Sequence, residues 1–324
     1  MSEPRQSESA KVQHSNTPIA SGHCLRIEYL PMKTFRDAVR ERNFVVTAEC
    51  FLKPETDAES IRHQAELLRG CVDGIVLRDN QYGALHMSTI AAARLLLDNE
   101  LDPIVQLSCR NRNRIALLAD LLGAVALGVS SLLLVHGNRV PKAIEPRPKA
   151  VLDMDAAELI ATAASLETDA RLGSIPDLFI GSTITPHTPK ANWVPSKLIE
   201  KTDAGARFLL AHTSMDIELL RGYMQHLIAA KLTRRVSVIV STAILTSADD
   251  ARWLRDNRPN VLIPDSVVQR LDKAGDPREE GLAICAEQLT QLATIPGVSG
   301  ANIIASTDLG MIPEAIDAAN LGEA

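Results

Sequence analysis

The chain has few aromatic residues and no excess of positive charge. Phe, Trp and Tyr make up 3% of its 324 residues, which leaves little for the stacking platforms that bind single-stranded nucleic acids. The formal net charge is −6, so no basic surface for a phosphate backbone is expected. Both shortages argue against a nucleic-acid partner.

Paired cysteines and long apolar runs are also missing. The five cysteines are scattered and form no CxxC pair, which argues against a disulfide framework and a zinc site. Free thiols of this kind are typical of a reducing compartment, and we expect a cytoplasmic protein. No apolar run in the chain approaches the roughly 18 residues of a membrane helix, so no membrane partner is expected.

The N-terminal residues differ in composition from the rest of the chain. Residues 1–24 are rich in Ser, Gln, Asn and His and lack the apolar core of a signal peptide, so we predict a disordered tail. Overall, 46% hydrophobic and 23% charged residues are typical of a soluble globular protein. We therefore predict one folded domain over residues 25–324.

Short apolar runs recur about every 30 residues, which is the length of a βαβ unit. Segments with one apolar helical face lie between them, and the first such face consists of Ile61, Ala65, Leu67 and Leu68. Eight strands that alternate with helices predict an α/β fold, the (β/α)8 TIM barrel. A doubly wound open sheet is the alternative, but eight evenly spaced units count against it. The expected strands are Phe44–Cys50, Gly74–Leu77, Ile104–Ser108, Leu132–Val135, Leu178–Gly181, Phe208–Ala211, Val236–Ser241 and Ala301–Ala305.

The connecting segments allow three more detailed predictions. After the third strand, Ile115, Leu118 and Leu122 form the apolar face of a helix. Residues 139–149 contain three prolines and form a long loop. Residues 249–296 hold two helices, the second of them long.

Polar residues follow several expected strands at the point where each apolar run ends. Because the strand ends of a parallel barrel meet at one face, these residues are expected to form a ligand site there. The clusters are Arg78-Asp79-Asn80-Gln81, Arg110-Asn111-Arg112-Asn113-Arg114 and His136-Gly137-Asn138.

Glu49 is the strongest single candidate for catalysis. It lies in an apolar run, directly before Cys50 and Phe51, and apolar surroundings favour the protonated form of a carboxyl group. A general acid at neutral pH requires that form. The alternative is a glutamate at the strand end that is solvated or paired with a neighbouring arginine.

The clusters after the second and third strands suit a charged heteroaromatic ligand. Asp79, Asn80 and Gln81 can read the edge of a heterocycle through paired donors and acceptors, or they can form an ordinary turn. The guanidinium groups from Arg110 onward suit phosphate or carboxylate groups. Alternatively, these arginines pair with Asp79 or Asp120.

The remaining candidates at strand ends include a glycine, a lysine and histidines. Gly137 allows the backbone to approach a ligand closely. Lys201 precedes the sixth strand, and His212 follows it, where a structural hydrogen bond is the more common role. The histidines show no HxH or HxxxH spacing, so no metal site is predicted.

Taken in order, these motifs resemble the methylenetetrahydrofolate reductase family, whose members are flavin-dependent (β/α)8 barrels. The resemblance extends over about residues 44–304, nearly the whole ordered chain. It rests on Val46-Thr47-Ala48-Glu49, on Asp79-Asn80-Gln81 with Met87-Ser88, on Gln106 through Leu122, on Lys201 through Asp216, and on Ile263-Pro264-Asp265 with Gly275-Asp276-Pro277 and Glu280-Gly281.

The resemblance implies a flavin-dependent activity in one-carbon metabolism. FAD would be reduced by NAD(P)H and pass a hydride to 5,10-methylenetetrahydrofolate, giving 5-methyltetrahydrofolate. It implies that Glu49 helps to open the folate ring by proton transfer, and it makes a homo-oligomer an expectation. We assign cofactor binding to Asp79, Gln106, Arg110, His136, Gly137, Asn138, His187 and Lys201, and binding of the tetrahydrofolate substrate to Gln81, Asn138 and His212.

Four departures from the family pattern follow, one of which is that the two prolines usual after the glutamate are here Phe51-Leu52-Lys53-Pro54. Asn138 stands where the family has an aspartate between flavin and folate, Arg78 replaces a threonine, and His212 replaces a glutamine that holds the pterin. Three functions therefore stay open: a flavin-dependent folate oxidoreductase, a flavin-free tetrahydrofolate-dependent enzyme of methyl transfer or demethylation, and a non-catalytic folate-binding subunit. The retained Glu49 favours an enzyme.

Overall fold

The computed structural model describes residues 33–321 except for 141–144, 173–174, 191 and 306–307. The tail predicted for residues 1–24 lies outside the described residues, as do residues 25–32 of the predicted domain. Within the described part of the chain, no helix is both long and apolar enough to cross a membrane.

Eight parallel strands form a closed barrel in which β8 pairs with β1. This confirms the predicted (β/α)8 fold and excludes the open sheet. The strand residues are almost all buried, because their side chains point either into the barrel or toward the surrounding helices. The strands are β1 (Val45–Cys50), β2 (Gly74–Leu77), β3 (Pro103–Ser108), β4 (Ser131–Val135), β5 (Phe179–Ile184), β6 (Phe208–Ala211), β7 (Ser237–Ile244) and β8 (Val298–Ala305).

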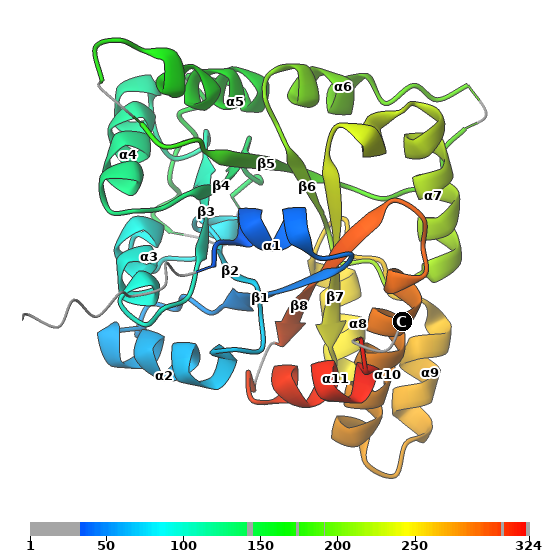
Figure 1. The fold of residues 1–324 in the computed structure, drawn as a ribbon. Helices are drawn as coiled ribbons and strands as arrows, with labels where there is room; N and C mark the ends of the chain where they lie inside the picture. The colour runs from blue at the N-terminus through cyan, green and yellow to red at the C-terminus, as the bar shows by residue number, and fades with distance from the viewer. Residues whose placement is uncertain (1–32, 141–144, 173–174, 191, 306–307, 322–324) are drawn as a thin grey trace, which may run out of the picture. The chain divides into compact units, whose positions relative to one another are not determined.

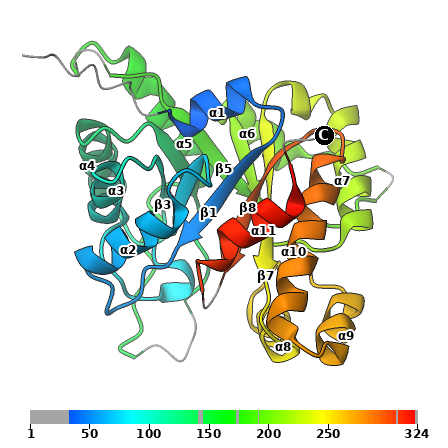
Figure 2. The same cartoon turned by 60° about the horizontal axis from the view of Figure 1, so that its bottom comes forward.

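Helices surround the barrel, and Figure 1 shows α1 (Phe35–Glu41) lying across one of its openings. Figure 2 shows α8 (Ala248–Asn257) and α9 (Asp265–Lys273) packed together beside the end of β7. The other helices are α2 (Ala58–Leu68), α3 (Thr89–Leu97), α4 (Arg114–Ala126), α5 (Ala156–Ser165), α6 (Ser196–Asp203), α7 (Ile217–Ala229), α10 (Pro277–Ala293) and α11 (Met311–Ala319), with short 3-10 turns η1 (Gln81–Gly83), η2 (Leu166–Thr168) and η3 (Leu232–Arg234).

Strands β5 and β7 each continue for three residues beyond their predicted ends. A hydroxyl residue follows each predicted end, Ser182 in β5 and Thr242 in β7, but both residues are completely buried. Ser182 donates its hydroxyl hydrogen to the carbonyl of Leu134 over 2.8 Å. A hydroxyl group that is hydrogen-bonded inside the barrel costs little, so β5 does not stop at Gly181. Oγ1 of Thr242 has no hydrogen-bond partner among the described residues, and β7 continues past it by pairing Thr242, Ala243 and Ile244 with β8.

The segment 249–296 contains three helices where two were predicted. The long second helix is broken between α9 and α10, where Asp276 accepts hydrogen bonds from the backbone N–H groups of Arg278 and Glu279. Pro277 occupies the first position of α10. A capping aspartate followed by proline starts a new helix, and this local signal is stronger than the continuous apolar periodicity.

The apolar face predicted for α4 is wrong. Leu117, Leu121 and Ala124 are the buried residues of this helix, whereas Ile115 is 77% exposed and Leu122 is 37% exposed. The helix is so rich in Leu and Ala that more than one face fits the helical period. Only its contact with the barrel decides which face is buried.

An aromatic cluster closes the N-terminal end of the barrel beneath α1. The ring of Phe35 lies 5.6 Å from that of Phe179 and 5.3 Å from that of Phe208, measured between centroids. Asp102 accepts a hydrogen bond from the backbone N–H of Phe35 over 2.7 Å, and burial raises the pKa of Asp102 to about 6. The opposite end is therefore the one left for a ligand.

Candidate functional site

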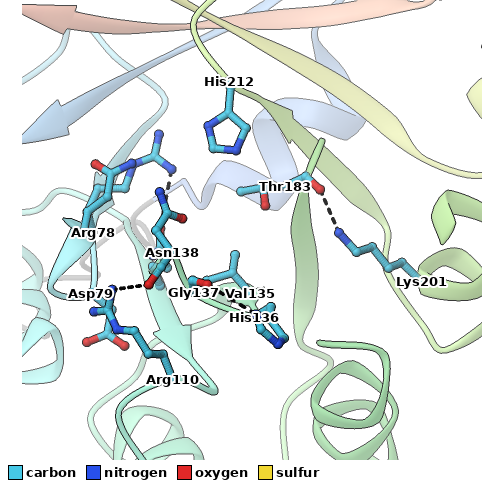
Figure 3. Close-up of a pocket in the computed structure, with 12 residues that line it drawn as sticks. Arg78, Asp79, Arg110, Val135, His136, Gly137, Asn138, Thr183, Lys201 and His212 are labelled. Carbon is cyan, nitrogen blue, oxygen red and sulfur yellow. Dashed lines mark hydrogen bonds between the residues drawn. The ribbon is translucent and has the colours of Figure 1, made fainter. Parts of the chain in front are cut away.

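A cavity of about 140 Å³ opens at the C-terminal ends of strands β2 to β6. Figure 3 shows Arg78, His212 and Asn138 gathered around it from separate elements. The lining residues that sequence analysis did not assign to a site are Arg78, Val135 and Thr183. Nine of the eleven assigned residues line it: Asp79, Gln81, Gln106, Arg110, His136, Gly137, Asn138, Lys201 and His212.

Glu49 lies in β1 and forms an ion pair with Arg78, which directly follows β2. Arg78 donates from Nε to Oε1 of Glu49 over 2.8 Å, and its Nη2 donates to the same oxygen. Its Nη1 reaches Oε1 of Gln106 at 3.4 Å. Glu49 is 6% exposed. The prediction that its surroundings are apolar is wrong, and the alternative holds, in which Glu49 pairs with a neighbouring arginine.

Buried polar groups inside the barrel hold Glu49 from the other side. Asn302 of β8 donates from Nδ2 to Oε1 of Glu49 over 3.1 Å. It also donates to Oγ of Ser241 over 3.2 Å, and its Oδ1 accepts from Thr47 over 3.0 Å. Because only one orientation of the amide satisfies all three bonds, Asn302 always turns its amino group toward Glu49.

Asp79 acts as an anchor between β2 and β3. Its carboxylate accepts from the backbone N–H of Ser108 over 2.8 Å and from Arg112 over 2.6 Å. Arg112 also pairs with Asp120 over 2.6 Å. The alternative prediction, in which the arginines form ion pairs within the protein, is therefore confirmed for Arg112. The charge of Asp79, at the edge of the cavity, is balanced by Arg112.

Arg110 is a buried cation without an acidic partner. It is 3% exposed and donates to the carbonyl oxygens of Asn138 over 2.9 Å and Asn80 over 2.6 Å, and to Oδ1 of Asn111 over 2.8 Å. No carboxylate in the described part of the chain forms an ion pair with it. Burial lowers the pKa of Arg110. Its positive charge therefore lies at the wall of the cavity without a carboxylate in direct contact among the described residues.

Lys201 and His212 face the cavity from α6 and from the end of β6. Lys201 donates from Nζ to the carbonyl of Thr183 over 2.8 Å, a bond visible in Figure 3, and burial lowers its pKa. Burial, with the charges of Arg78 and Lys201, lowers the pKa of His212 to about 4. The imidazole is therefore neutral at pH 7 and can both donate and accept a hydrogen bond.

Gly137 makes a close approach to β3 rather than to open space. Its φ is +95°, and a Cβ there would lie 2.2 Å from Oγ of Ser108. Only glycine fits both constraints. Gly137 also lines the cavity, and close approach of a ligand to its backbone stays a prediction.

A second cavity of about 740 Å³ lies along the loop after β4 and shares Arg110 and Asn138 with the first. The described residues between 139 and 149 form no helix or strand, as predicted. This cavity is lined by Arg139, Arg147 and Lys149, and none of its lining residues is acidic. An anionic ligand in the first cavity could extend into it.

His187 is the assigned residue that the structure places elsewhere. Its ring contacts those of Trp193 and Tyr223, with centroids 4.8 and 5.3 Å away, and its Nδ1 lies 3.1 Å from the carbonyl oxygen of Thr185. It does not line the cavity. Sequence reasoning missed Asn302, because an isolated amide in an apolar strand carries no motif.

The chemistry available at the cavity is that of hydrogen bonds and positive charge. In the described part of the chain, no three His, Cys, Asp or Glu side chains come together as metal ligands. Glu49 is held beside the cavity through Arg78, while Arg110 and Lys201 contribute charge without counter-ions. This arrangement suits an anionic ligand with a polar ring system.

Comparisons with known proteins identify one family, and the solved structures with a similar fold include the two that follow. A family model described as methylenetetrahydrofolate reductase matches residues 34–304. An uncharacterized protein from Clostridium thermocellum that binds two copies of 5-methyl-5,6,7,8-tetrahydrofolic acid has a TM-score of 0.61 at 14% identity, with 88% of this chain and 97% of that chain covered. DmoA from Hyphomicrobium sulfonivorans has a TM-score of 0.53 at 12% identity, with 86% and 87% covered. At these sequence identities, the two matches show a shared fold and no more. No curated protein matched.

Proposed function

The chain belongs to the methylenetetrahydrofolate reductase family, and from this membership we propose that it interconverts 5,10-methylenetetrahydrofolate and 5-methyltetrahydrofolate, with FAD as cofactor and NAD(P)H as hydride donor. The observation that carries the proposal is the meeting of nine assigned residues at one cavity. That cavity lies at the strand ends where barrels of this kind bind their ligands.

One buried cation, Arg110, and one half-buried cation, Lys201, support an anionic cofactor at this cavity. Arg110 and Lys201 donate only to neutral oxygens in the described part of the chain, and a buried charge without a partner is costly. The diphosphate of FAD would balance them, and its chain could extend past Arg139 and Arg147. When bound, the flavin supplies hydride transfer.

Gln81, His212 and Glu49 are assigned to the folate. Gln81 and the neutral His212 would hold the polar edge of the pterin. Glu49 would exchange the proton of ring opening at Oε2, since its Oε1 already accepts from Arg78 and Asn302. The Clostridium thermocellum neighbour, which binds 5-methyltetrahydrofolic acid, supports a folate as the ligand.

A second candidate is a flavin-free tetrahydrofolate-dependent enzyme of methyl transfer or demethylation. It is favoured by Asn138, which leaves this position of the cavity without the family's carboxylate, and by Arg78, which adds a cation beside Glu49. Both changes alter the charge where flavin and folate would meet.

Ligand binding by the purified protein tests both candidates. The protein would be incubated with FAD, desalted and examined for flavin absorbance, and 5-methyltetrahydrofolate binding would be followed separately by calorimetry. Retention of both ligands is expected. Folate binding without flavin would favour the second candidate, and binding of neither by folded protein would refute both.

Substitution of Lys201 tests where the cofactor lies. We expect K201M to weaken FAD binding by about tenfold to a hundredfold, because an anion loses its charged partner. R114M is the control, since Arg114 belongs to the neighbouring arginine cluster but does not line the cavity. Equal FAD affinity in K201M and R114M would contradict this placement. A homo-oligomer remains a prediction.

A further inference from the structure

Helix α4 has a second apolar face, which points away from the barrel. Leu117 and Leu121 are buried on the barrel side. Figures 1 and 2 both show α4 at an outer edge, and no other described element covers its outer face in either view. The residues of this outer face are all apolar and all exposed: Ile115, Ala119, Leu122 and Ala126.

The spacing of the outer face is that of a contact between two helices. Its four residues follow one another at intervals of four, three and four positions, which is the repeat of the a and d positions in a coiled coil. A helix that only covers a barrel carries polar residues on its solvent side. The outer face of α4 therefore has the pattern of a helix with a second packing partner.

Other exposed apolar side chains lie close to this face. Leu127 directly follows α4, and the segment with Val151 and Leu152 lies beside its start, since the backbone N–H of Val151 donates to the carbonyl of Arg110. Together with Ile115 and Leu122, these residues make up five of the nine exposed large apolar side chains in the described part of the chain. Such a concentration marks a surface that contacts another molecule.

We propose that α4 packs against α4 of a second copy of this chain, in antiparallel orientation, to form a two-fold symmetric dimer. A two-fold interface must be complementary to itself. If the axis passes between Ala119 and Leu122, these two residues face each other across the interface. Ile115 then faces the partner subunit's Ala126. Each layer of the contact joins one large and one small side chain, whereas parallel pairing would set large against large and small against small.

The charges at the two ends of α4 fit the same orientation. The N-terminal end carries the positive end of the helix dipole and Arg114, whose ion pair with Glu158 spans 3.6 Å between half-exposed side chains. The C-terminal end lies beside the end of α3, because Arg94 donates to the carbonyl of Leu127. There Glu100 is exposed and has no ion pair with any described residue. Antiparallel pairing brings Arg114 of one copy toward this acidic end of the other.

The size of the contact sets the expected affinity. Helix α4 has 13 residues, so it is about 20 Å long and about 10 Å wide. Its outer face is smaller than the roughly 800 Å² per partner of a standard interface. We therefore expect a reversible dimer with a dissociation constant on the order of micromolar. The proposal does not depend on the reaction at the cavity.

Sedimentation equilibrium of the full chain over about 1–300 µM tests the association. The mass should rise from 35.1 kDa toward twice that value as the concentration increases. L122E should weaken the dimer at least about tenfold, because it places a carboxylate in an apolar contact. I228E is the matched control, since Ile228 of α7 is 40% exposed and Leu122 is 37% exposed. A wild type that stays monomeric, or a dimer that folded L122E leaves unchanged, would overturn the proposal.

Cysteine crosslinking tests the orientation without adding charge. A short bismaleimide should join two copies of I115C/A126C but not two copies of I115C, because antiparallel pairing keeps the two thiols at position 115 about 16 Å apart along the helix axis. The wild type, treated in the same way, gives the background from the native thiols. Equal crosslinking of I115C and I115C/A126C would refute antiparallel pairing. Background crosslinking of both variants, at concentrations where the mass doubles, would show that the dimer does not form through α4.

Discussion

At the residue scale, the cavity is marked by how its charges are balanced. Arg78 and Arg112 have carboxylate partners, whereas Arg110 and Lys201 have only carbonyl and amide oxygens among the described residues. His212, placed between cations, stays neutral. A folded protein tolerates this imbalance most readily where a ligand supplies the missing charge.

The neutral His212 should make stability depend on pH. Its folded pKa is about 4, against about 6.5 in the unfolded chain, so between these values the unfolded state binds a proton that the folded state rejects. The free energy of unfolding should fall by up to about 3 kcal/mol as the pH drops through this window. Urea denaturation at pH 7 and pH 4.5 measures the effect.

The variant H212N should lose that part of the pH dependence. H63N, at an exposed position of α2, is the control and should keep it. Identical slopes in the wild type and H212N would show that another group carries the loss of stability at acid pH.

At the element scale, close packing between helices and strands requires glycine at individual positions. Gly281 lies in α10, where a Cβ would meet the carbonyl oxygen of Leu245 at 1.7 Å. Gly123 lies inside α4, where a Cβ would meet nothing within 4 Å. Both are helical glycines, so their different surroundings separate tertiary packing from helix propensity.

Alanine substitutions at these glycines should have opposite effects on stability. G281A should lower the free energy of unfolding by about 2–3 kcal/mol, because the helix must move away from the end of β7. G123A should raise it by about 0.5–1 kcal/mol through helix propensity. Urea denaturation of both variants measures the difference, and a stabilising G281A would contradict the close contact.

At the scale of the whole barrel, the aromatic cluster and the candidate ligand cavity lie at opposite ends. The aromatic cluster of Phe35, Phe179 and Phe208 fills the N-terminal end, while the cavity lies at the C-terminal ends of the strands. This separation allows a rigid core at one end of the barrel and specificity for a ligand at the other end.

The substitution F35A tests this division. It should lower the free energy of unfolding by about 3–5 kcal/mol, because a fully buried ring is removed, yet leave the affinity for 5-methyltetrahydrofolate unchanged at low temperature. Urea denaturation and calorimetry on the same preparation measure both quantities. Lost affinity in folded F35A would mean that the two ends are coupled.

The sequence predicted elements better than contacts. Strands such as Gly74–Leu77 and Phe208–Ala211 were located to the residue, since a strand buried on both faces is a local apolar run. The face of α4 and the break before α10 were not, because several faces fit one period and a cap competes with that period. His187 was assigned to the cofactor from a resemblance that does not encode where its loop packs.

By itself, the sequence determined the (β/α)8 barrel and the end of it at which polar groups collect, because both follow from local periodicity and from polar residues at strand ends. Only the tertiary structure decided that Glu49 is paired with Arg78 and held by Asn302. The three residues are brought together by closure of the barrel, with β8 lying beside β1. No local pattern reports a contact across more than 250 positions of the chain, and such contacts determine the charge state of the site.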